Sequence, residues 1–307
     1  MRVAGIRLTS GPVESFELPE PRALASDEVL IEVRATGVDN WDEIARTGGW
    51  DLGVTPPMAL GVEAAGSVVA VGDAVTGVGP GDDVVTHPLP LREQGAWAEK
   101  LIAPAECVAR KPSSVAWDVA GAFAVPALTA EQVLSEAVRL RPGERLLVHG
   151  GGGVTGGLMV ELATLRGGFV IATAGASSRA RVRDRGAHEV VDYRDEDWLE
   201  AVLRLTGGQG VNAAVNLVRN GAVDALRGVT HGGRLATITS DPPPPERGIA
   251  ISTVYVRADG RQLAALVDLL GAGRLTLPVG ATYPLSQAAA ALAAVGGSAG
   301  RAVVMVP

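Results

Sequence analysis

The chain has 307 residues and a formal net charge of −7, and 47% of its residues are apolar while 20% are charged. This balance predicts a globular protein with a core of substantial size and excludes an intrinsically disordered chain. The negative net charge, together with the lack of a basic stripe of Lys and Arg, excludes nucleic acid as the main partner. At roughly 150 residues per domain, the length predicts two domains.

The cysteine content and the apolar stretches indicate in which cellular compartment the protein is expected. The single cysteine, Cys107, excludes an intramolecular disulfide and fits a reducing compartment, so we expect a cytoplasmic protein. The N-terminal sequence MRVAGIRLTSG alternates like a strand and lacks the features of a signal peptide. Because every apolar stretch falls short of the about 20 residues that a membrane span needs, we expect a soluble protein without a membrane partner.

The hydrophobic pattern changes along the chain. Residues 1–115 contain short β-rich runs separated by Gly and Pro turns, which predicts a mostly β domain. Residues 116–274 contain longer periodic segments, and Pro126 is expected to break or kink the first helical stretch. The closing residues, 275–307, predict strand, helix and strand, and we expect them to return to the first domain.

Nearly all-apolar segments in the second region predict parallel strands that are covered on both faces. They are RLLVHG, GFVIATA, HEVVDY, VNAAVNLV and GGRLATITS. Helical segments such as GGLMVELATLRG separate them, which is typical of an α/β fold with a doubly wound parallel sheet. The run DPPPPER (241–247) then predicts an extended connection, and GIAISTVYV (248–256) predicts an edge strand able to pair across a two-fold axis.

Six glycines occupy eight positions between the first of these strands and the helix that follows it. Gly151, Gly153 and Gly156 match the pattern G-x-G-x-x-G, which in this context predicts a dinucleotide-binding turn. The first glycine permits the tight turn, the second lets a pyrophosphate approach, and the third lets the helix pack closely. Val154 and Thr155 belong to the same expected cofactor site, at the helix N-terminus. A glycine-rich turn without a ligand is the alternative.

The end of the second strand bears on which dinucleotide binds. Thr173, Ala174 and Gly175 stand where NAD-binding proteins carry an acidic residue for the ribose 2′-hydroxyl. Hydroxyl and guanidinium side chains follow, namely Ser177, Ser178, Arg179 and Arg181. Because such groups suit an added phosphate, the sequence predicts NADPH as the cofactor, with Thr173, Ser178 and Arg179 in its site. A solvated helix face is the alternative for the arginines.

Several stretches, taken in order, carry a family resemblance. They are DEVLIEVRATGVDNWDEIARTG, LGVEAAGSVVAVGDAVTGVGPGDDV, LLVHGGGGVTGGLMVELA, GAHEVVDYRDEDW, VRADGRQLAALVDLLGAGRL and GRAVVMVP. Over essentially its whole length the chain resembles the medium-chain dehydrogenase/reductase superfamily, in its zinc-independent quinone oxidoreductase branch. The resemblance implies a chaperonin-10-like small-barrel catalytic domain (1–115 and 275–307) and a Rossmann nucleotide domain (116–274), with the active site between them and a homodimeric assembly.

The resemblance also implies roles for individual residues. It places Tyr193 and Arg179 against the adenosine 2′-phosphate, Thr129 against the nicotinamide ribose, and Arg301 near the cofactor. Without the family, Tyr193 is a strand-end aromatic, Thr129 an ordinary helix threonine and Arg301 an exposed arginine.

The metal question follows from the same comparison. Zinc-dependent members of the superfamily carry Cys where this chain has Asp39, and His where Val62 precedes Glu63. One Cys and four His cannot assemble the zinc sites of those members, so no metal is expected. Without zinc, hydride transfer requires an acceptor that is already electrophilic, and the expected small-molecule substrate is a quinone or an α,β-unsaturated carbonyl compound.

The expected catalytic residues lie in one loop: Asp39, Trp41 and Asp42. Many relatives read Gly-Val-Asn-Pro-Val-Asp there, so Asp42 matches the family while Asp39 replaces an amide. An ionised carboxylate only accepts hydrogen bonds, so either the pKa of Asp39 is raised and it acts as an acid, or the pocket is altered. Helix capping by both aspartates is the alternative.

Aromatic residues and a histidine of the first domain are further candidates. Trp41, Trp50 and Trp97 would suit a flat, aromatic substrate, with core packing as the alternative. His87 is a candidate proton donor, although a lone histidine in a loop is more often incidental.

Together these observations predict an NADPH-dependent quinone or enone reductase. Two other classes stay open. One is a pathway-specific enzyme of the same fold that uses acid/base chemistry, such as cyclisation or elimination, on a biosynthetic intermediate. The other is a non-catalytic binding protein, because a fold alone does not fix a function.

Overall fold

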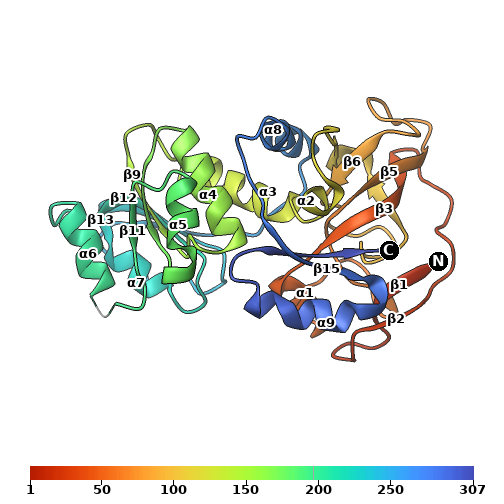
Figure 1. The fold of residues 1–307 in the computed structure, drawn as a ribbon, viewed down its shortest axis with the longest axis horizontal. Coiled ribbons are helices and arrows are strands. Elements are labelled where there is room, and N and C mark those ends of the chain that lie inside the picture. The colour runs from red at the N-terminus through yellow and green to blue at the C-terminus, as the bar shows by residue number, and fades with distance from the viewer. Residues whose placement is uncertain (196) are drawn as a thin grey trace. The chain divides into compact units, whose positions relative to one another are not determined.

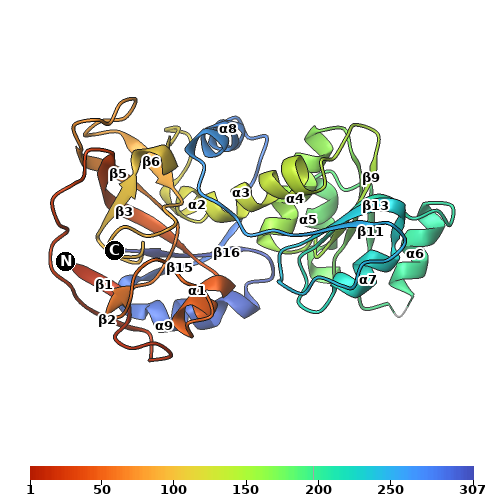
Figure 2. The same cartoon turned by 180° about the vertical axis from the view of Figure 1, so that it is seen from behind.

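The computed structural model describes residues 1–195 and 197–307, which form two compact units. The first unit contains Met1–Leu128 and Arg257–Pro307, and the second contains Thr129–Val256 (Figure 1, Figure 2). These boundaries differ from the predicted changes at 115 and 275. Helices α2 (Trp117–Gly121) and α8 (Gly260–Gly271) belong to the first unit, because Gly121 lies against Ala35, and Gly260 against the backbone of Val108. Within the described residues, no helix combines the length and apolar character that a membrane crossing requires.

The first unit is built around strand β3 (Glu28–Val38). Its antiparallel partners are β5 (Ala64–Val71), β7 (Lys100–Pro104) and β16 (Ala302–Val306). The larger sheet is completed by β6 (Asp83–Thr86), β8 (Val108–Arg110) and β15 (Val279–Pro284). A smaller sheet contains β1 (Arg2–Ile6), β2 (Glu14–Glu17) and β4 (Met58–Ala59). The pairing of β16 with β3 confirms that the C-terminal residues return to the first domain.

The helices of the first unit are short, apart from α8. They include α1 (Asn40–Arg46) and α9 (Ala288–Ala294). The stretch expected to break at Pro126 is interrupted just before it, at Ala122 and Phe123, between α2 and α3 (Ala124–Gln132). Pro126 therefore lies in the first turn of α3, where backbone amides have no partner within the helix and a missing N–H costs nothing.

An ion pair between an exposed arginine and a buried carboxylate fixes the connection that leads into β3. Glu28 is buried, and its two carboxylate oxygens accept hydrogen bonds from the Arg22 guanidinium at 2.7 and 2.8 Å. The amide of Ala25 donates to the same carboxylate at 2.8 Å. Because the hydrogen bonds from Arg22 outweigh the effect of burial, the pKa of Glu28 falls to about 2.

The second unit contains six parallel strands in the order β11-β10-β9-β12-β13-β14. They are β9 (Arg145–His149), β10 (Phe169–Thr173), β11 (Glu189–Val191), β12 (Val211–Asn216), β13 (Val229–Thr237) and β14 (Ala250–Thr253). The first five confirm the strands predicted from sequence, and β14 confirms the predicted edge strand. In chain order this is the Rossmann arrangement 3-2-1-4-5-6, which reverses between β9 and β12.

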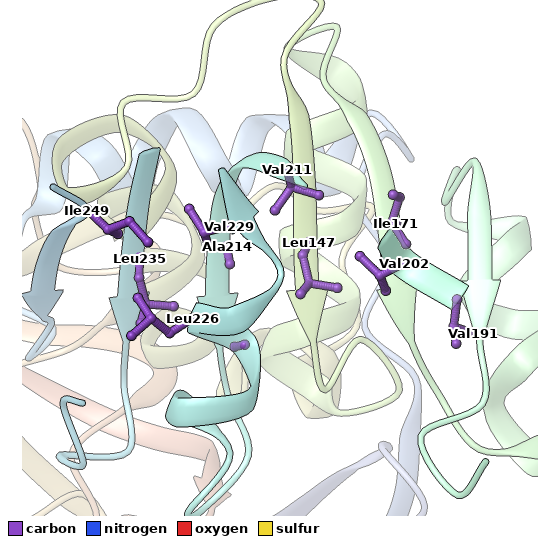
Figure 3. Packing of buried hydrophobic residues seen from close by; sticks show 11 residues of the cluster. Leu147, Ile171, Val191, Val202, Val211, Ala214, Leu226, Val229, Leu235 and Ile249 are labelled. Carbon is purple, nitrogen blue, oxygen red and sulfur yellow. The ribbon is translucent and has the colours of Figure 1, made fainter. Parts of the chain in front are cut away.

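Helices cover both faces of this sheet, as Figure 1 shows. They are α4 (Val154–Leu165) and α5 (Ala176–Asp184) on one face, and α6 (Trp198–Leu205) and α7 (Ala222–Arg227) on the other. On the second face, Leu147, Ile171 and Leu235 project from the strands toward Val202 of α6 and Leu226 of α7 (Figure 3). This apolar layer holds the carboxyl ends of the strands at one edge, where ligands of such sheets bind.

The Glu28 pair predicts a pH-dependent contribution to stability. A lowered folded-state pKa adds stability above the usual carboxyl pKa of 4.5, and this contribution is lost as the pH falls toward about 2. We expect Glu28→Gln to lower the urea midpoint of unfolding at pH 7, with the difference from the parent shrinking steadily below pH 4.5. Glu17→Gln, at an exposed position of β2, is the control. An equal difference at pH 7 and pH 3 would contradict the assignment.

Candidate functional site

The glycine turn connects β9 to α4, and its geometry explains most of its glycines. Gly150 has a φ of 102°, a backbone conformation that residues other than glycine rarely adopt. A Cβ on Gly151 would lie 2.9 Å from the Cβ of Ala172, and one on Gly156 only 2.2 Å from the carbonyl oxygen of Gly150. The first and third glycines of the motif are therefore needed by the fold itself.

Gly153 is different, because no contact with residues 1–195 or 197–307 requires a glycine there. It is the N-cap of α4 with ordinary extended dihedrals (φ −76°, ψ 175°). The nearest atom to an added Cβ would be the Gly150 carbonyl oxygen, at 3.6 Å. Space is thus free at the N-terminus of a twelve-residue helix, at the point where the strand order reverses. This cradle fits a pyrophosphate that approaches the backbone closely.

Side chains from β10 and α5 fix the glycine turn from within. The Thr173 hydroxyl accepts a hydrogen bond from the Gly150 amide at 2.9 Å and lies 3.0 Å from Nδ1 of His149. The Arg181 guanidinium donates to the Gly152 carbonyl at 3.0 Å. Ser178 is buried and donates to the Gly175 carbonyl at 3.2 Å, with its hydroxyl directly beside Gly152. The predicted site residues Thr173 and Ser178 therefore position the turn, because their hydroxyls are engaged inside the protein.

Two other predicted residues lie on either side of the β10–α5 turn. Tyr193 follows β11, is half exposed, and its ring lies beside Gly175 at the end of β10. Arg179 lines a pocket of about 390 Å³ whose wall also contains Asp192 and Asp195. The family resemblance implied that both residues contact the adenosine 2′-phosphate. In the structure, Tyr193 lies beside Gly175, whereas Arg179 lies beside carboxylates.

The remaining predicted cofactor residues belong to several elements. Val154 and Thr155 open α4, and Thr155 is buried. Thr129 is a buried residue of α3 and the first residue of the second unit. Arg301 is exposed, belongs to the first unit, and directly precedes β16.

A polar network at the ends of β12 and β13 was not anticipated from the sequence. The buried Asn216 amide donates to the Thr237 hydroxyl at 3.1 Å and to the Thr239 hydroxyl at 2.9 Å. Both hydroxyls also donate to Asp241. Partial burial raises the pKa of Asp241, but these hydrogen bonds outweigh it and hold that pKa below its usual value. The signal in the sequence was the amide of Asn216 directly after the apolar run of residues 213–215.

Beside this network, the Ser240 hydroxyl donates to the Tyr255 hydroxyl at 3.1 Å. Ser240 has a φ of 59°, and Tyr255 is exposed just beyond β14. The second half of the carboxyl edge is therefore lined by hydroxyl and amide groups and by the carboxylate of Asp241.

The expected catalytic aspartates cap helix α1. Asp39 is the N-cap and accepts from the Asn40 amide at 2.9 Å, while Asp42 accepts from the Asp39 amide at 2.8 Å. The structure thus confirms the capping alternative as a feature of this pair. Desolvation raises the pKa of Asp39 to about 6 and that of Asp42 well above its usual value.

A buried glutamate lies near this pair. Glu63 accepts from the Val125 amide at 2.8 Å and so caps the start of α3. Its pKa is raised well above the usual value, chiefly by burial and further by the charges of Asp39 and Asp42. Each of the three carboxyls thus accepts hydrogen bonds from backbone amides.

The aromatic candidates of the first unit divide by burial. Trp97 is fully buried and its indole donates to the Gly37 carbonyl at 3.0 Å, so it packs in the core. Trp41 and Trp50 are partly exposed. His87 is buried, with Nδ1 2.7 Å from the Val62 carbonyl, and burial lowers its pKa to about 4. Because a carbonyl only accepts, the proton is on Nδ1 and Nε2 is an acceptor, which argues against the proton-donor expectation.

Comparisons with known proteins all find similarity to dehydrogenases and quinone oxidoreductases. Family models match for an alcohol dehydrogenase GroES-like domain (residues 25–124) and a zinc-binding dehydrogenase (residues 185–304). The quinone oxidoreductases of Sus scrofa and Homo sapiens are 29% and 28% identical, each over 91% of both chains.

Solved structures extend this similarity. Mycobacterial Rv1454c complexed with NADPH is 30% identical with a TM-score of 0.87, and an NAD-dependent alcohol dehydrogenase is 28% identical with a TM-score of 0.90. Both similarities cover 100% of each chain. These two relatives differ in the cofactor they are named for.

The glycine geometry predicts opposite results for two matched substitutions. Gly153→Ala should leave the unfolding midpoint nearly unchanged but weaken dinucleotide binding by at least about tenfold, because the methyl group fills the cradle. Gly156→Ala should destabilise the protein by roughly 1–3 kcal/mol through overpacking against Gly150. Thermal unfolding and calorimetric titration with NADPH test both. Unchanged NADPH affinity in Gly153→Ala would remove the cradle from the cofactor site.

The raised pKa of Asp39 predicts a pH effect opposite to that of Glu28. Ionised Asp39 is less favourable in the folded state, so stability is lost as the pH rises from its usual pKa of 3.8 through about 6. Asn caps a helix about as well as Asp but stays neutral. We therefore expect Asp39→Asn to raise the urea midpoint above pH 6 and to have little effect near pH 4, with the exposed Asp73→Asn as control. A gain that is independent of pH would rule out this explanation.

Proposed function

The chain belongs to the medium-chain dehydrogenase/reductase superfamily, in its quinone oxidoreductase-like branch, and from that premise we propose that it transfers hydride from NADPH to a quinone or an α,β-unsaturated carbonyl compound without a metal ion. The observation that carries the proposal is the free space at Gly153, at the start of α4. An oxidoreductase of this family needs a dinucleotide, and this is where its pyrophosphate would approach the backbone.

The residues around this turn would hold the cofactor in a defined pose. The amides at the start of α4 would bind the pyrophosphate, and Thr173 and Arg181 keep the turn in shape. The adenosine half would lie over β10 and β11, and the nicotinamide half over β12 and β13, beside the network of Asn216 and Thr237. When bound, NADPH supplies the hydride.

Metal independence is supported by the groups that stand where a zinc site would be. Asp39 and Glu63 have their carboxyl oxygens engaged by backbone amides, and Val62 has no ligand atom in its side chain. Raised pKa values further disfavour the ionised form that a metal would bind. A reaction without a Lewis acid requires a substrate whose carbon is already electrophilic, as in quinones and enones.

The edge strand of the parallel sheet supports a homodimer. Strand β14 pairs with β13 and forms the edge of the parallel sheet, with Tyr255 exposed just beyond it. We propose that two copies join these edges across a two-fold axis, because paired edges satisfy their backbone groups.

Turnover of the purified enzyme tests the proposed function. We expect oxidation of NADPH by a benzoquinone or by a simple enone, at a rate that a chelator leaves unchanged. Deuterium at C4 of NADPH should appear in the enone product, which shows that the hydride is transferred. Absence of binding to both NADPH and NADH would refute the oxidoreductase assignment. Full loss of activity with the chelator, restored by zinc, would refute metal independence alone.

A further inference from the structure

We propose that Arg194, together with the ring of Tyr193, reads the 2′-phosphate of the cofactor, and that Arg179 does not. This inference rests on the proposed function, because it concerns the adenosine end of NADPH. It assigns the specificity to a residue that neither the glycine motif nor the family resemblance indicated.

The first step is the position of Arg194. It lies in the turn after β11, and its amide donates to the Asp192 carboxylate at 3.0 Å, which fixes the backbone of the turn. An added Cβ on Gly175 would lie 3.1 Å from a guanidinium nitrogen of Arg194 and 3.3 Å from the Tyr193 ring. Gly175 follows β10 and is the N-cap of α5. Both side chains therefore cover the end of the second strand, where the adenosine ribose of a Rossmann dinucleotide lies.

The second step is the state of the guanidinium. It stacks over the Tyr193 ring with its carbon 5.2 Å from the ring centre, an arrangement that orients the planar group. An oriented arginine is suited to bind a phosphate dianion by two parallel hydrogen bonds.

The third step concerns Arg179, the residue expected from the sequence. Its side chain lines the 390 Å³ pocket between β11 and α6, which also contains Glu189, Asp192, Asp195 and Arg204. Three carboxylates in that pocket oppose a dianion, whereas they balance the charges of the two arginines. Arg179 therefore faces the carboxylates of this pocket, whereas the guanidinium of Arg194 lies over Gly175.

The fourth step is the glycine at position 175. NAD-binding relatives of this fold place an acidic side chain near the end of the second strand to bind the ribose 2′-hydroxyl. Here an added Cβ would lie 3.1 Å from a guanidinium nitrogen of Arg194, closer than an ordinary contact, so the glycine leaves room for the guanidinium. An aspartate introduced at this position would pair with Arg194 and repel a phosphate.

Titration calorimetry with adenosine 2′,5′-bisphosphate and with 5′-AMP tests this assignment without requiring turnover. Arg194→Ala should weaken the bisphosphate by about 10- to 100-fold, the range expected for charge-assisted hydrogen bonds, and leave 5′-AMP nearly unchanged. Arg179→Ala, the matched control, should change both by less than about threefold. Gly175→Asp should reverse the preference between NADPH and NADH.

The outcomes separate this inference from the proposed function. Loss of bisphosphate affinity in Arg179→Ala, with Arg194→Ala unchanged, would overturn the assignment while leaving an NADPH-dependent enzyme. An equal loss of bisphosphate and 5′-AMP in Arg194→Ala would also overturn it, because the residue would then serve the shared adenosine. If the parent protein binds the bisphosphate no better than 5′-AMP, the inference and the choice of NADPH are both wrong.

Discussion

The nucleotide unit depends on one close approach, that of helix α4 to the turn that follows β9. Gly156 lies so near the Gly150 carbonyl that a single added carbon would be 2.2 Å from it. This approach aims the helix N-terminus at the carboxyl edge of the sheet and leaves Gly153 facing free space. Thr173 and Arg181 secure the turn from the neighbouring elements. The binding capacity of the unit is thus a consequence of packing, since the helix dipole and its free amides act only where they point.

The carboxyl groups of the first unit show how the same residue type takes opposite roles. Glu28 is buried with an arginine that donates twice to it, and its pKa falls. Asp39 and Glu63 are desolvated with amides as partners, and their pKa values rise. Neutral amides do not offset the loss of hydration as a guanidinium does. The capping carboxyls therefore hold their helices while keeping a proton available at higher pH than usual.

Periodicity and motif spacing predicted the fold well because both reflect local and repetitive constraints. The five apolar strands, the edge strand and the glycine turn all follow from patterns within a few residues of one another. The return of the C-terminal strand to β3 joins distant residues, and the family resemblance implied it. The domain boundaries differed because α2 and α8 are placed by contacts such as that of Gly121 with Ala35, which are distant in sequence.

The candidate site was predictable only in part, for a related reason. The sequence identifies a hydroxyl but not which way it points, so it could not show that Thr173 accepts from Gly150 or that Ser178 donates to Gly175. The sequence alone does not distinguish Arg179 from Arg194. Only the fold shows that Arg179 faces carboxylates and that Arg194 lies over Gly175. The network of Asn216, Thr237 and Asp241 depends on the alignment of two strands, which no single segment encodes.

The carboxyl edge of the sheet is chemically asymmetric, and that asymmetry supports the NADPH site that we propose. The half formed by β9, β10 and β11 carries guanidinium groups, with Arg181 at the glycine turn and Arg194 at Gly175. The half formed by β12, β13 and β14 carries the hydroxyls of Thr239, Ser240 and Tyr255, beside the carboxylate of Asp241. NADPH has the same polarity, with three phosphates toward its adenosine end and an uncharged ring and ribose at the reacting end when reduced. Charge can therefore fix the cofactor at one end while weaker neutral hydrogen bonds leave the nicotinamide free to exchange hydride.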